Sequence, residues 1–258
     1  MPAKHVSPLG PYLFSVELRR DRGPDFTRYP FNLPAVRTLD RLEFHPRVTF
    51  LIGENGTGKS TLLEALAVAC DLNAEGGSAN FRFQTRETEY ELERFLKLSK
   101  NPILPGDSFF LRAETFYNVA TEIERLAVDS AYGPKRLHDQ SHGESFLALF
   151  ENRFHGRGLY LLDEPEAALS PTRQMSFLIL LKRLCDAGSQ FVIATHSPIV
   201  MAYPDAWIYV LGEKAPQRVP YDETEHYRVS RAFLTNHKKV LANLFKDDDA
   251  QSPESGMT

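Results

Sequence analysis

Cysteine is scarce in this chain of 258 residues, which contains only Cys70 and Cys185. Two cysteines are too few for the disulfide framework of small secreted domains, and both lie in apolar, helix-like patterns, so we expect reduced core residues. Long apolar runs are also absent. Because no 18 consecutive apolar residues occur, we expect no spanning helix and no direct membrane insertion. No apolar targeting segment is visible near the start, so the expected location is cytoplasmic.

A strong charge imbalance is lacking as well. Lys and Arg total 30 and Asp and Glu total 34, which gives a formal net charge of −4. This balance argues against a uniformly basic protein that coats nucleic acid, although a local basic patch stays possible. The 15 glycines and 17 prolines exclude collagen-like and low-complexity chains. The remaining composition is typical of a globular protein with one large domain or two small ones.

Short apolar runs alternate with helical patterns along the chain. Residues 12–19 alternate as in a half-buried strand, with Tyr12, Phe14, Val16 and Leu18 on one face. Continuous apolar runs predict buried strands at 48–52, 159–162 and 191–194. Helices are predicted at 60–70, 171–187 and 226–245. This alternation indicates an α/β fold with a largely parallel sheet.

Polar stretches and a Pro/Gly break change the pattern in the middle of the chain. We interpret residues 73–155 as an inserted, mostly helical lobe of a single domain whose core comprises 12–72 and 156–245. Residues 246–258 are acidic, polar and without periodicity, which predicts a disordered tail. The run 109–118 within the lobe is interpreted as core with an Arg112–Glu114 ion pair; the alternative is an element that recognises a partner.

The strongest chemical signal is Gly53-Glu54-Asn55-Gly56-Thr57-Gly58-Lys59-Ser60, which matches the phosphate-binding pattern G-x-x-x-x-G-K-[ST] without a mismatch. Glycines let the backbone curl so that its N–H groups face phosphates, and the helix that follows directs its positive end at them. Lys59 is expected to reach the β- and γ-phosphates, Ser60 to bind Mg²⁺, and Thr61 to contact the α-phosphate. The expected nucleotide-binding residues are Asn55, Gly56, Thr57, Gly58, Lys59, Ser60 and Thr61.

Two carboxylates follow the buried strand at 159–162. Ligands collect at the carboxyl ends of parallel strands, so Asp163 is a candidate Mg²⁺ ligand. Glu164 is a candidate general base for the water that attacks the γ-phosphorus. The alternative is an acidic pair that only caps a turn. His196 follows the strand at 191–194 and is a candidate contact to the γ-phosphate and that water, although a lone histidine at a strand end is often structural.

Five segments now resemble a known family in their order along the chain. They are residues 53–60, Ser141-His142-Gly143-Glu144, Leu161-Leu162-Asp163-Glu164-Pro165, Ala168-Leu169-Ser170-Pro171 and Thr195-His196-Ser197. Together they resemble the ABC-type ATPases. The chain is similar to stand-alone members without a membrane domain, the small ATPases related to the SMC, RecF-like and overcoming-lysogenisation-defect proteins. The resemblance implies a P-loop NTPase fold of ABC type, with a mostly parallel central sheet, an N-terminal antiparallel β portion and an inserted helical lobe.

The resemblance also implies roles for individual residues. Ser141 and Gly143 would contact the γ-phosphate held by a second subunit, with His142 where the family usually has glycine. Ser170 stands where the loop at the dimer interface usually has an acidic residue, and an N-cap role fits it equally well. Gln84 is the candidate glutamine that links the metal to the inserted lobe. Tyr29 is the candidate that stacks on adenine, with Phe26 and Phe31 as alternatives.

These expectations lead to one functional hypothesis and its competitors. The chain is expected to bind and hydrolyse ATP with Mg²⁺ as an ATP-sandwiched homodimer. It would act as a soluble switch or regulatory ATPase on an unknown protein or nucleic-acid partner. The alternative is an ATP-binding subunit of a transporter with separate membrane subunits. A kinase or GTPase is disfavoured because no N-K-x-D motif occurs.

Overall fold

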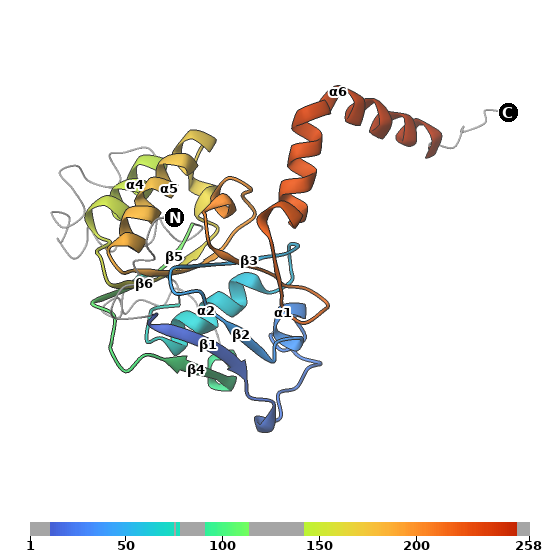
Figure 1. Cartoon of the computed structure of the whole chain (residues 1–258). Helices are drawn as coiled ribbons and strands as arrows, with labels where there is room; N and C mark the ends of the chain where they lie inside the picture. Colours follow the sequence, from blue (N-terminus) through green and yellow to red (C-terminus); the bar gives the residue numbers. More distant parts are fainter. Residues whose placement is uncertain (1–10, 75, 78–90, 114–141, 252–258) are drawn as a thin grey trace. The chain divides into compact units, whose positions relative to one another are not determined.

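The computed structural model describes residues 11–74, 76–77, 91–113 and 142–251 (Figure 1). The chain divides into two compact units, one up to Val219 and one from Pro220 onward. This division was not expected from the sequence, which indicated a single domain. Among the described residues, no helix is both long and apolar enough to cross a bilayer.

The first unit is built on a central sheet of six strands in the order β5-β6-β7-β3-β8-β9. Its strands are β3 (Val48–Ile52), β5 (Asp107–Arg112), β6 (Gly158–Asp163), β7 (Gln190–Ala194), β8 (Trp207–Val210) and β9 (Gln217–Val219). The five strands from β5 to β8 pair in parallel, and only β9 pairs antiparallel. Every residue of β3, β6 and β7 is buried, which explains why their sequences are continuous apolar runs. The predicted, largely parallel sheet is confirmed.

A smaller antiparallel sheet has the order β2-β1-β4, with β1 at Leu13–Leu18, β2 at Arg41–Glu43 and β4 at Leu96–Lys100. The expected alternation of faces along β1 is wrong at one point. Phe14 is 40% exposed whereas Ser15 is 1% exposed. The pairing of β1 with β4 shifts register between Leu13 and Ser15, and such a bulge moves the next side chain to the opposite face.

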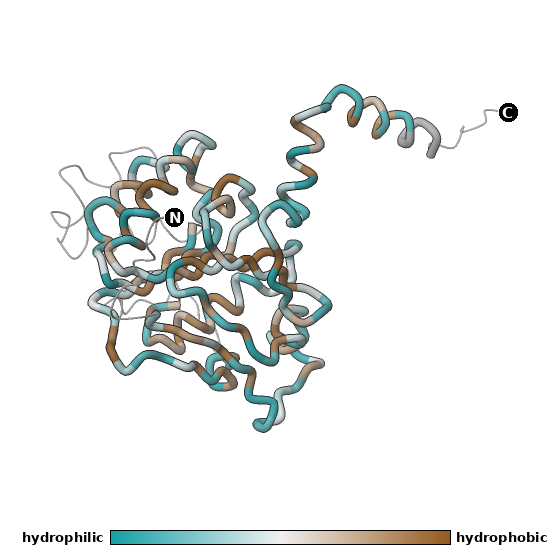
Figure 2. Tube along the Cα trace, viewed as in Figure 1, coloured by the Kyte–Doolittle hydropathy of each residue, from teal (hydrophilic) through white to brown (hydrophobic). Residues whose placement is uncertain are grey.

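Helices cover both faces of the central sheet (Figure 1). On one side lie α2 (Lys59–Ala69) and the short α1 (Pro34–Arg37), and on the other lie α4 (His142–Asn152) and α5 (Pro171–Asp186). The main core cluster joins apolar side chains of β1, α2 and β6, and the strands of the central sheet are among the most apolar parts of the chain (Figure 2). Phe150 of α4 packs edge-on against Phe177 of α5, with ring centroids 5.0 Å apart.

Two strands lie where a mostly helical insertion was expected. Within residues 73–155, β4 belongs to the antiparallel sheet and β5 forms the edge of the central sheet beside β6. Short strands flanked by polar residues and a Pro/Gly break give little periodic signal, so they are hard to detect from sequence. Phe109 and Leu111 of β5 are buried, as the core interpretation of this run requires.

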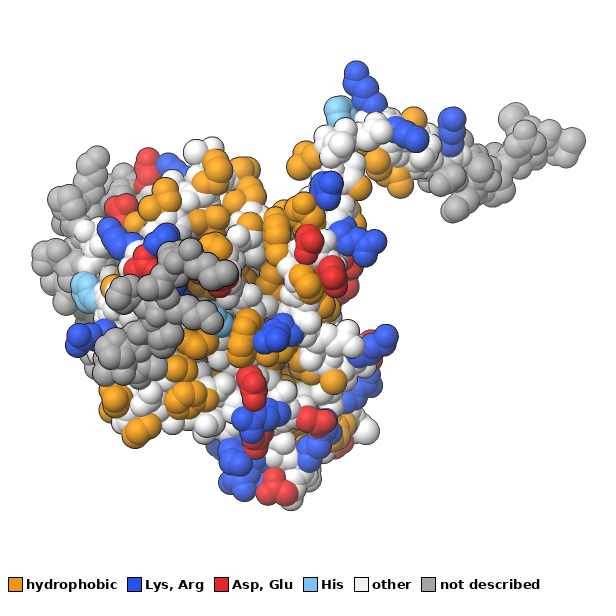
Figure 3. All heavy atoms as spheres, in the orientation of Figure 1, with side chains coloured by type: hydrophobic (Ala, Val, Ile, Leu, Met, Phe, Trp, Pro, Cys, Tyr) orange, Lys and Arg blue, Asp and Glu red, His pale blue; other side chains and the backbone are white. Residues whose placement is uncertain are grey.

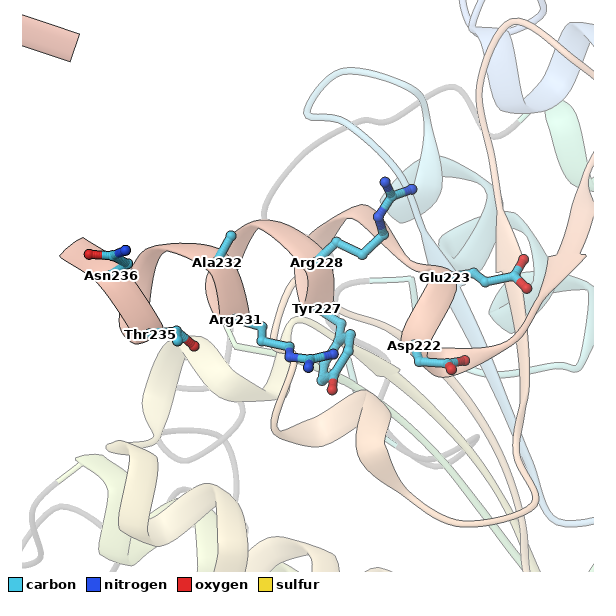
Figure 4. Close-up of a pocket in the computed structure, with 8 residues that line it drawn as sticks. All are labelled: Asp222, Glu223, Tyr227, Arg228, Arg231, Ala232, Thr235 and Asn236. Atoms are coloured by element: carbon cyan, nitrogen blue, oxygen red, sulfur yellow. The ribbon is translucent and has the colours of Figure 1, made fainter. Parts of the chain in front are cut away.

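The second unit consists of a short turn of helix and α6 (Glu225–Gln251). The Thr224 hydroxyl accepts a hydrogen bond from the Tyr227 N–H, at 3.3 Å, and so caps the start of α6. The helix bends at Asn236, whose φ of −147° and ψ of 46° are not helical. It continues to Gln251, into the segment for which a disordered tail was predicted. A hollow of about 540 Å³ lies along its first turns (Figure 4) and shares no residue with the site described next.

Candidate functional site

The loop after β3 has a backbone that only glycine permits at two points. Gly53 has φ of +148°, and a Cβ there would lie 2.3 Å from the carbonyl oxygen of Leu211. Gly58 has φ of +98°, and a Cβ there would lie 3.0 Å from the Cβ of Leu33. A larger residue at either position would have to move the loop or its neighbour. The curled loop expected from the sequence is therefore present, and α2 begins directly after it.

Lys59 lies across this loop. Its ammonium donates hydrogen bonds to the carbonyl oxygens of Gly53, at 2.8 Å, and Glu54, at 2.9 Å. The residue is 4% exposed. Burial lowers the pKa of Lys59, and the nearby carboxylates of Glu164 and Asp163 oppose that shift. The loop carbonyls thus hold a buried cation beside the first turn of α2, where phosphate oxygens are expected to bind.

Ser60, in the first turn of α2, contacts Asp163, the last residue of β6, although 103 positions separate them in sequence. The Ser60 hydroxyl donates to Oδ1 of Asp163 at 3.0 Å. A hydroxyl and a carboxylate are hard oxygen donors, which suit Mg²⁺. The described residues contain no group of three or more His, Cys, Asp or Glu side chains that could hold a metal. Ser60 and Asp163, two of the three expected magnesium ligands, thus lie within hydrogen-bond distance of each other.

Glu164 and His196 are also brought together. Oε1 of Glu164 lies 3.6 Å from Nε2 of His196. Glu164 adopts the left-handed conformation, with φ of +49°, which is uncommon for a residue with a side chain and recurs at functional sites. Its backbone N–H donates to the carbonyl oxygen of Ala194 at 2.9 Å, which ties the end of β6 to the end of β7. The side chains of His196 and Glu164 are 29% and 41% exposed, although Nε2 of His196 itself is buried.

Glu166 is a site residue that the sequence patterns did not reveal. Its Oε1 accepts hydrogen bonds from the backbone N–H groups of His196, at 2.5 Å, and Ser197, at 3.1 Å. Burial raises the pKa of Glu166, and the hydrogen bond from the His196 N–H partly offsets this. The carboxylate lies two residues after the candidate base and holds the loop that carries the histidine. The one signal in the sequence is that a second glutamate follows Glu164 two positions later.

A second contact joins the same two loops. Gln174 of α5 is 9% exposed, donates to the carbonyl oxygen of Leu169 at 3.1 Å, and accepts from the Ser197 hydroxyl at 2.6 Å. The Ser197 hydroxyl in turn accepts from the backbone N–H of Val200 at 3.1 Å. Satisfied buried polar networks of this kind fix one loop arrangement. The segment 165–170 and the loop after β7 therefore form one hydrogen-bonded unit.

The start of α4 packs closely against the end of that segment. A Cβ on Gly143 would lie 2.8 Å from the carbonyl oxygen of Ala168, so this position requires glycine. Arg173 lies 3.1 Å from Glu144 and joins α5 to α4. The N–H of Arg173 donates to the Ser170 hydroxyl at 3.4 Å, which confirms Ser170 as an N-cap. Ser141 and Gln84, two further predicted site residues, lie outside the described residues.

Three aromatic residues were candidates for stacking on adenine. Phe31 is 2% exposed and packs against Phe95, with centroids 4.8 Å apart, so it belongs to the core. The ring of Phe26 lies under the guanidinium of Arg20, 5.0 Å away. Tyr29 is 67% exposed and its hydroxyl lies 3.5 Å from that of Thr61 at the start of α2. Tyr29 is therefore the candidate best placed for adenine.

Models of two protein families match separate parts of the chain. One, described as an AAA domain, matches residues 32–125. The other matches residues 145–202, and its description, also of an AAA domain, further names an AbiEii toxin and a type IV TA system. The first match contains the phosphate-binding loop, and the second contains Asp163, Glu164 and His196. The two halves of the site are thus matched independently.

Similar proteins include a drug resistance protein and an import ATP-binding protein. The chain is 24% identical over 234 residues to the brefeldin A resistance protein of Schizosaccharomyces pombe, covering 81% of this chain and 14% of that protein. It is 28% identical over 162 residues to the thiamine import ATP-binding protein ThiQ of Haemophilus influenzae, covering 57% and 75%. The chain therefore spans about a seventh of the length of the fungal relative.

Among solved structures, the SMC head domain from Thermotoga maritima aligns with a TM-score of 0.47 and 18% identity, over 81% of this chain and 99% of that one. The two family matches and the curated relatives thus make this chain similar to AAA-type domains and to ATP-binding proteins.

Proposed function

We propose that the chain hydrolyses ATP at the site formed by Lys59, Asp163, Glu164 and His196. The observation that carries the proposal is their convergence at the carboxyl ends of the adjacent strands β3, β6 and β7. In a parallel sheet this edge is where ligands bind, and here it presents a buried cation, two carboxylates and an imidazole. The loop backbone and Lys59 bind the phosphates, and the exposed ring of Tyr29 packs against the base.

The side chains divide the chemistry between them. Glu164 accepts a proton from water as the water oxygen bonds to the γ-phosphorus and the bond to the bridging oxygen of ADP breaks. His196, 3.6 Å from that carboxylate, donates a hydrogen bond to the γ-phosphate and orients the water. Ser60 and Asp163 hold Mg²⁺, which supplies charge neutralisation on the phosphate oxygens.

The proposal includes an ATP-dependent homodimer. Gly143 of α4, together with Ser141, would contact the γ-phosphate bound by the opposite subunit. Its support is indirect. The start of α4 packs on residue 168, and the segment 165–170 is hydrogen-bonded to the loop that carries His196. A subunit that docks on α4 would therefore touch elements already joined to the catalytic residues.

The proposed cellular role is that of a switch or regulatory ATPase acting on a protein or nucleic acid. The arginines that follow β1 give little support to nucleic-acid binding, because Arg19 and Arg20 lie beside carboxylates. Arg20 lies 2.7 Å from Asp40, and Arg19 lies 3.3 Å from Asp21. The face in Figure 3 shows acidic and basic side chains intermingled. A transporter subunit is the second candidate, favoured by the similarity to ThiQ.

One experiment tests hydrolysis and dimerisation together. The variant Glu164→Gln keeps the shape of the side chain but cannot accept the proton. We expect ATP turnover to fall by about a hundredfold or more, and ATP to convert the variant to a dimer in light scattering. Glu54→Gln is the matched control, since it removes an exposed carboxylate from the same site and should retain turnover.

Three outcomes would contradict the proposal. Retained turnover in Glu164→Gln would show that Glu164 is not the base. A variant that binds ATP yet stays monomeric would refute the sandwiched dimer while leaving hydrolysis standing. Lys59→Ala provides the third: unchanged ATP affinity, measured with a fluorescent analogue, would show that the loop does not bind the phosphates.

A further inference from the structure

Arg112 is a charged residue at the metal-binding edge for which the proposed function has no use. It is the last residue of β5, and the pairing of β5 with β6 places it directly opposite Asp163. The sequence predicted an ion pair between Arg112 and Glu114, which lies outside the described residues. Among the described residues, Arg112 lies beside carboxylates of two other elements, one on α2 and one at the end of β6.

The guanidinium of Arg112 contacts two carboxylates, those of Glu64 and Asp163. Nη1 of Arg112 donates to Oε2 of Glu64 at 2.8 Å, and Nε lies 3.4 Å from Oδ2 of Asp163. The other oxygen of Asp163, Oδ1, accepts from Ser60. The side chains of Arg112 and Glu64 are 21% and 19% exposed, and that of Asp163 is 6% exposed. One oxygen of the candidate metal ligand thus accepts a hydrogen bond from this chain, and the other lies at ion-pair distance from a guanidinium.

This arrangement has an electrostatic consequence for a cation at Ser60 and Asp163. A buried carboxylate requires a partner, and the guanidinium supplies one. A divalent cation bound to the same carboxylate would lie close to that positive charge, and at low exposure their repulsion is only weakly screened. Glu64 offers Arg112 a second acceptor, so the guanidinium can give up Asp163 without losing its only acid.

We propose that Arg112 sets the metal affinity of this site, as a positioning residue that competes with Mg²⁺ for Asp163 and is drawn aside by Glu64. This inference rests on the proposed function. Arg112 keeps Asp163 correctly placed when no metal is bound, and it weakens metal binding to the nucleotide complex. Glu64 acts in the opposite direction, because it stabilises the guanidinium in the position that leaves Asp163 to the metal.

The test measures metal binding directly, with Mn²⁺ in place of Mg²⁺ and electron paramagnetic resonance to count free Mn²⁺ at saturating ADP. Arg112→Gln removes the charge and keeps a polar side chain of similar reach. We expect it to bind Mn²⁺ about tenfold more tightly than the wild type. Arg112→Lys retains the charge and should stay within about threefold of the wild type. Glu64→Gln should bind Mn²⁺ about threefold more weakly.

The opposite signs of the two changes separate this proposal from a structural role for the same residues. If Arg112→Gln binds Mn²⁺ no more tightly than the wild type, the proposal is overturned. If Arg112→Gln does not fold, Glu64→Gln decides, and unchanged or tighter Mn²⁺ binding overturns it. If the wild type binds ADP and Mn²⁺ but Arg112→Gln binds Mn²⁺ no more tightly, only this inference is refuted. If the wild type binds neither ADP nor Mn²⁺, the proposed function is refuted as well.

Discussion

Glu166→Ala is the perturbation that tests most directly how the loop after β7 is held. The carboxylate accepts from the backbone N–H groups of His196 and Ser197, at 2.5 and 3.1 Å. Removing it leaves both N–H groups without this acceptor, and Ser197 is only 6% exposed. We therefore expect the loop to move until water or another oxygen replaces the lost partner.

The cost follows from two opposing contributions. Hydrogen bonds to a charged acceptor contribute about 1.5–3 kcal/mol each, so two of them give at most about 6 kcal/mol. Burial of the carboxylate opposes them, as the raised pKa of Glu166 indicates, and its removal recovers part of that desolvation cost. We expect Glu166→Ala to lower the free energy of unfolding by about 2–4 kcal/mol, and Glu166→Gln, which keeps one acceptor oxygen, by about 1 kcal/mol.

Activity should respond more strongly than nucleotide binding. A displaced loop moves His196 away from Glu164, and a shift of about 1 Å at a catalytic group can slow a reaction by about a hundredfold. We expect kcat to fall at least about tenfold and the KM for ATP to change little, because the contacts of Lys59 with the loop are untouched. Urea unfolding followed by the fluorescence of Trp207, the only tryptophan, gives stability, and phosphate release gives turnover.

A double variant provides the refutation. If Glu166 acts through His196, then Glu166→Ala should slow the His196→Ala enzyme far less than it slows the wild type. Equal slowing in both backgrounds would show that Glu166 does not act through the histidine. A loss of activity that follows only the loss of stability, and that Glu166→Gln does not rescue, would show that the carboxylate serves folding alone.

Three further predictions concern pH, the loop and the base. Burial raises the pKa of Glu166 above its ordinary 4.5, so the folded state holds the proton more tightly than the unfolded state. In urea unfolding, the stability of the wild type relative to Glu166→Gln should therefore fall as the pH rises from 4.5 through the raised pKa. A stability difference that does not change with pH would contradict this. Gly53→Ala should lower the free energy of unfolding by about 3 kcal/mol, because the new Cβ would clash with the Leu211 carbonyl. Gly56→Ala, whose Cβ would have no atom within 4 Å, should lower it by only about 1 kcal/mol. Equal losses in thermal unfolding would refute the steric argument. Tyr29→Ala should weaken ATP binding about tenfold in fluorescence titration with kcat unchanged, and unchanged affinity would exclude it as the base-stacking residue.

The phosphate-binding loop and the buried strands could both be predicted from neighbouring residues alone. Gly53 and Gly58 are local requirements of a curled backbone, and the apolar runs of β3, β6 and β7 follow from burial on both faces, so each can be detected within a few residues. The N-cap at Ser170 was predictable for the same reason. Asp163, Glu164 and His196 could be named because each follows such a run and parallel strands end at one edge.

The contacts between polar side chains became known only from the folded arrangement of the chain. Arg112 contacts Glu64 and Asp163, and Glu166 holds the loop of His196, through contacts between residues far apart in sequence that no local pattern records. On α5 the apolar side chain of Met175 is 54% exposed, whereas that of Leu181 is buried. Periodicity indicates that a helix has an apolar stripe, but its rotation is set by packing on the sheet. Backbone conformation and burial leave a pattern among neighbouring residues, so they can be predicted from the sequence. Ion pairs and the packed face of a helix depend on distances that exist only after folding.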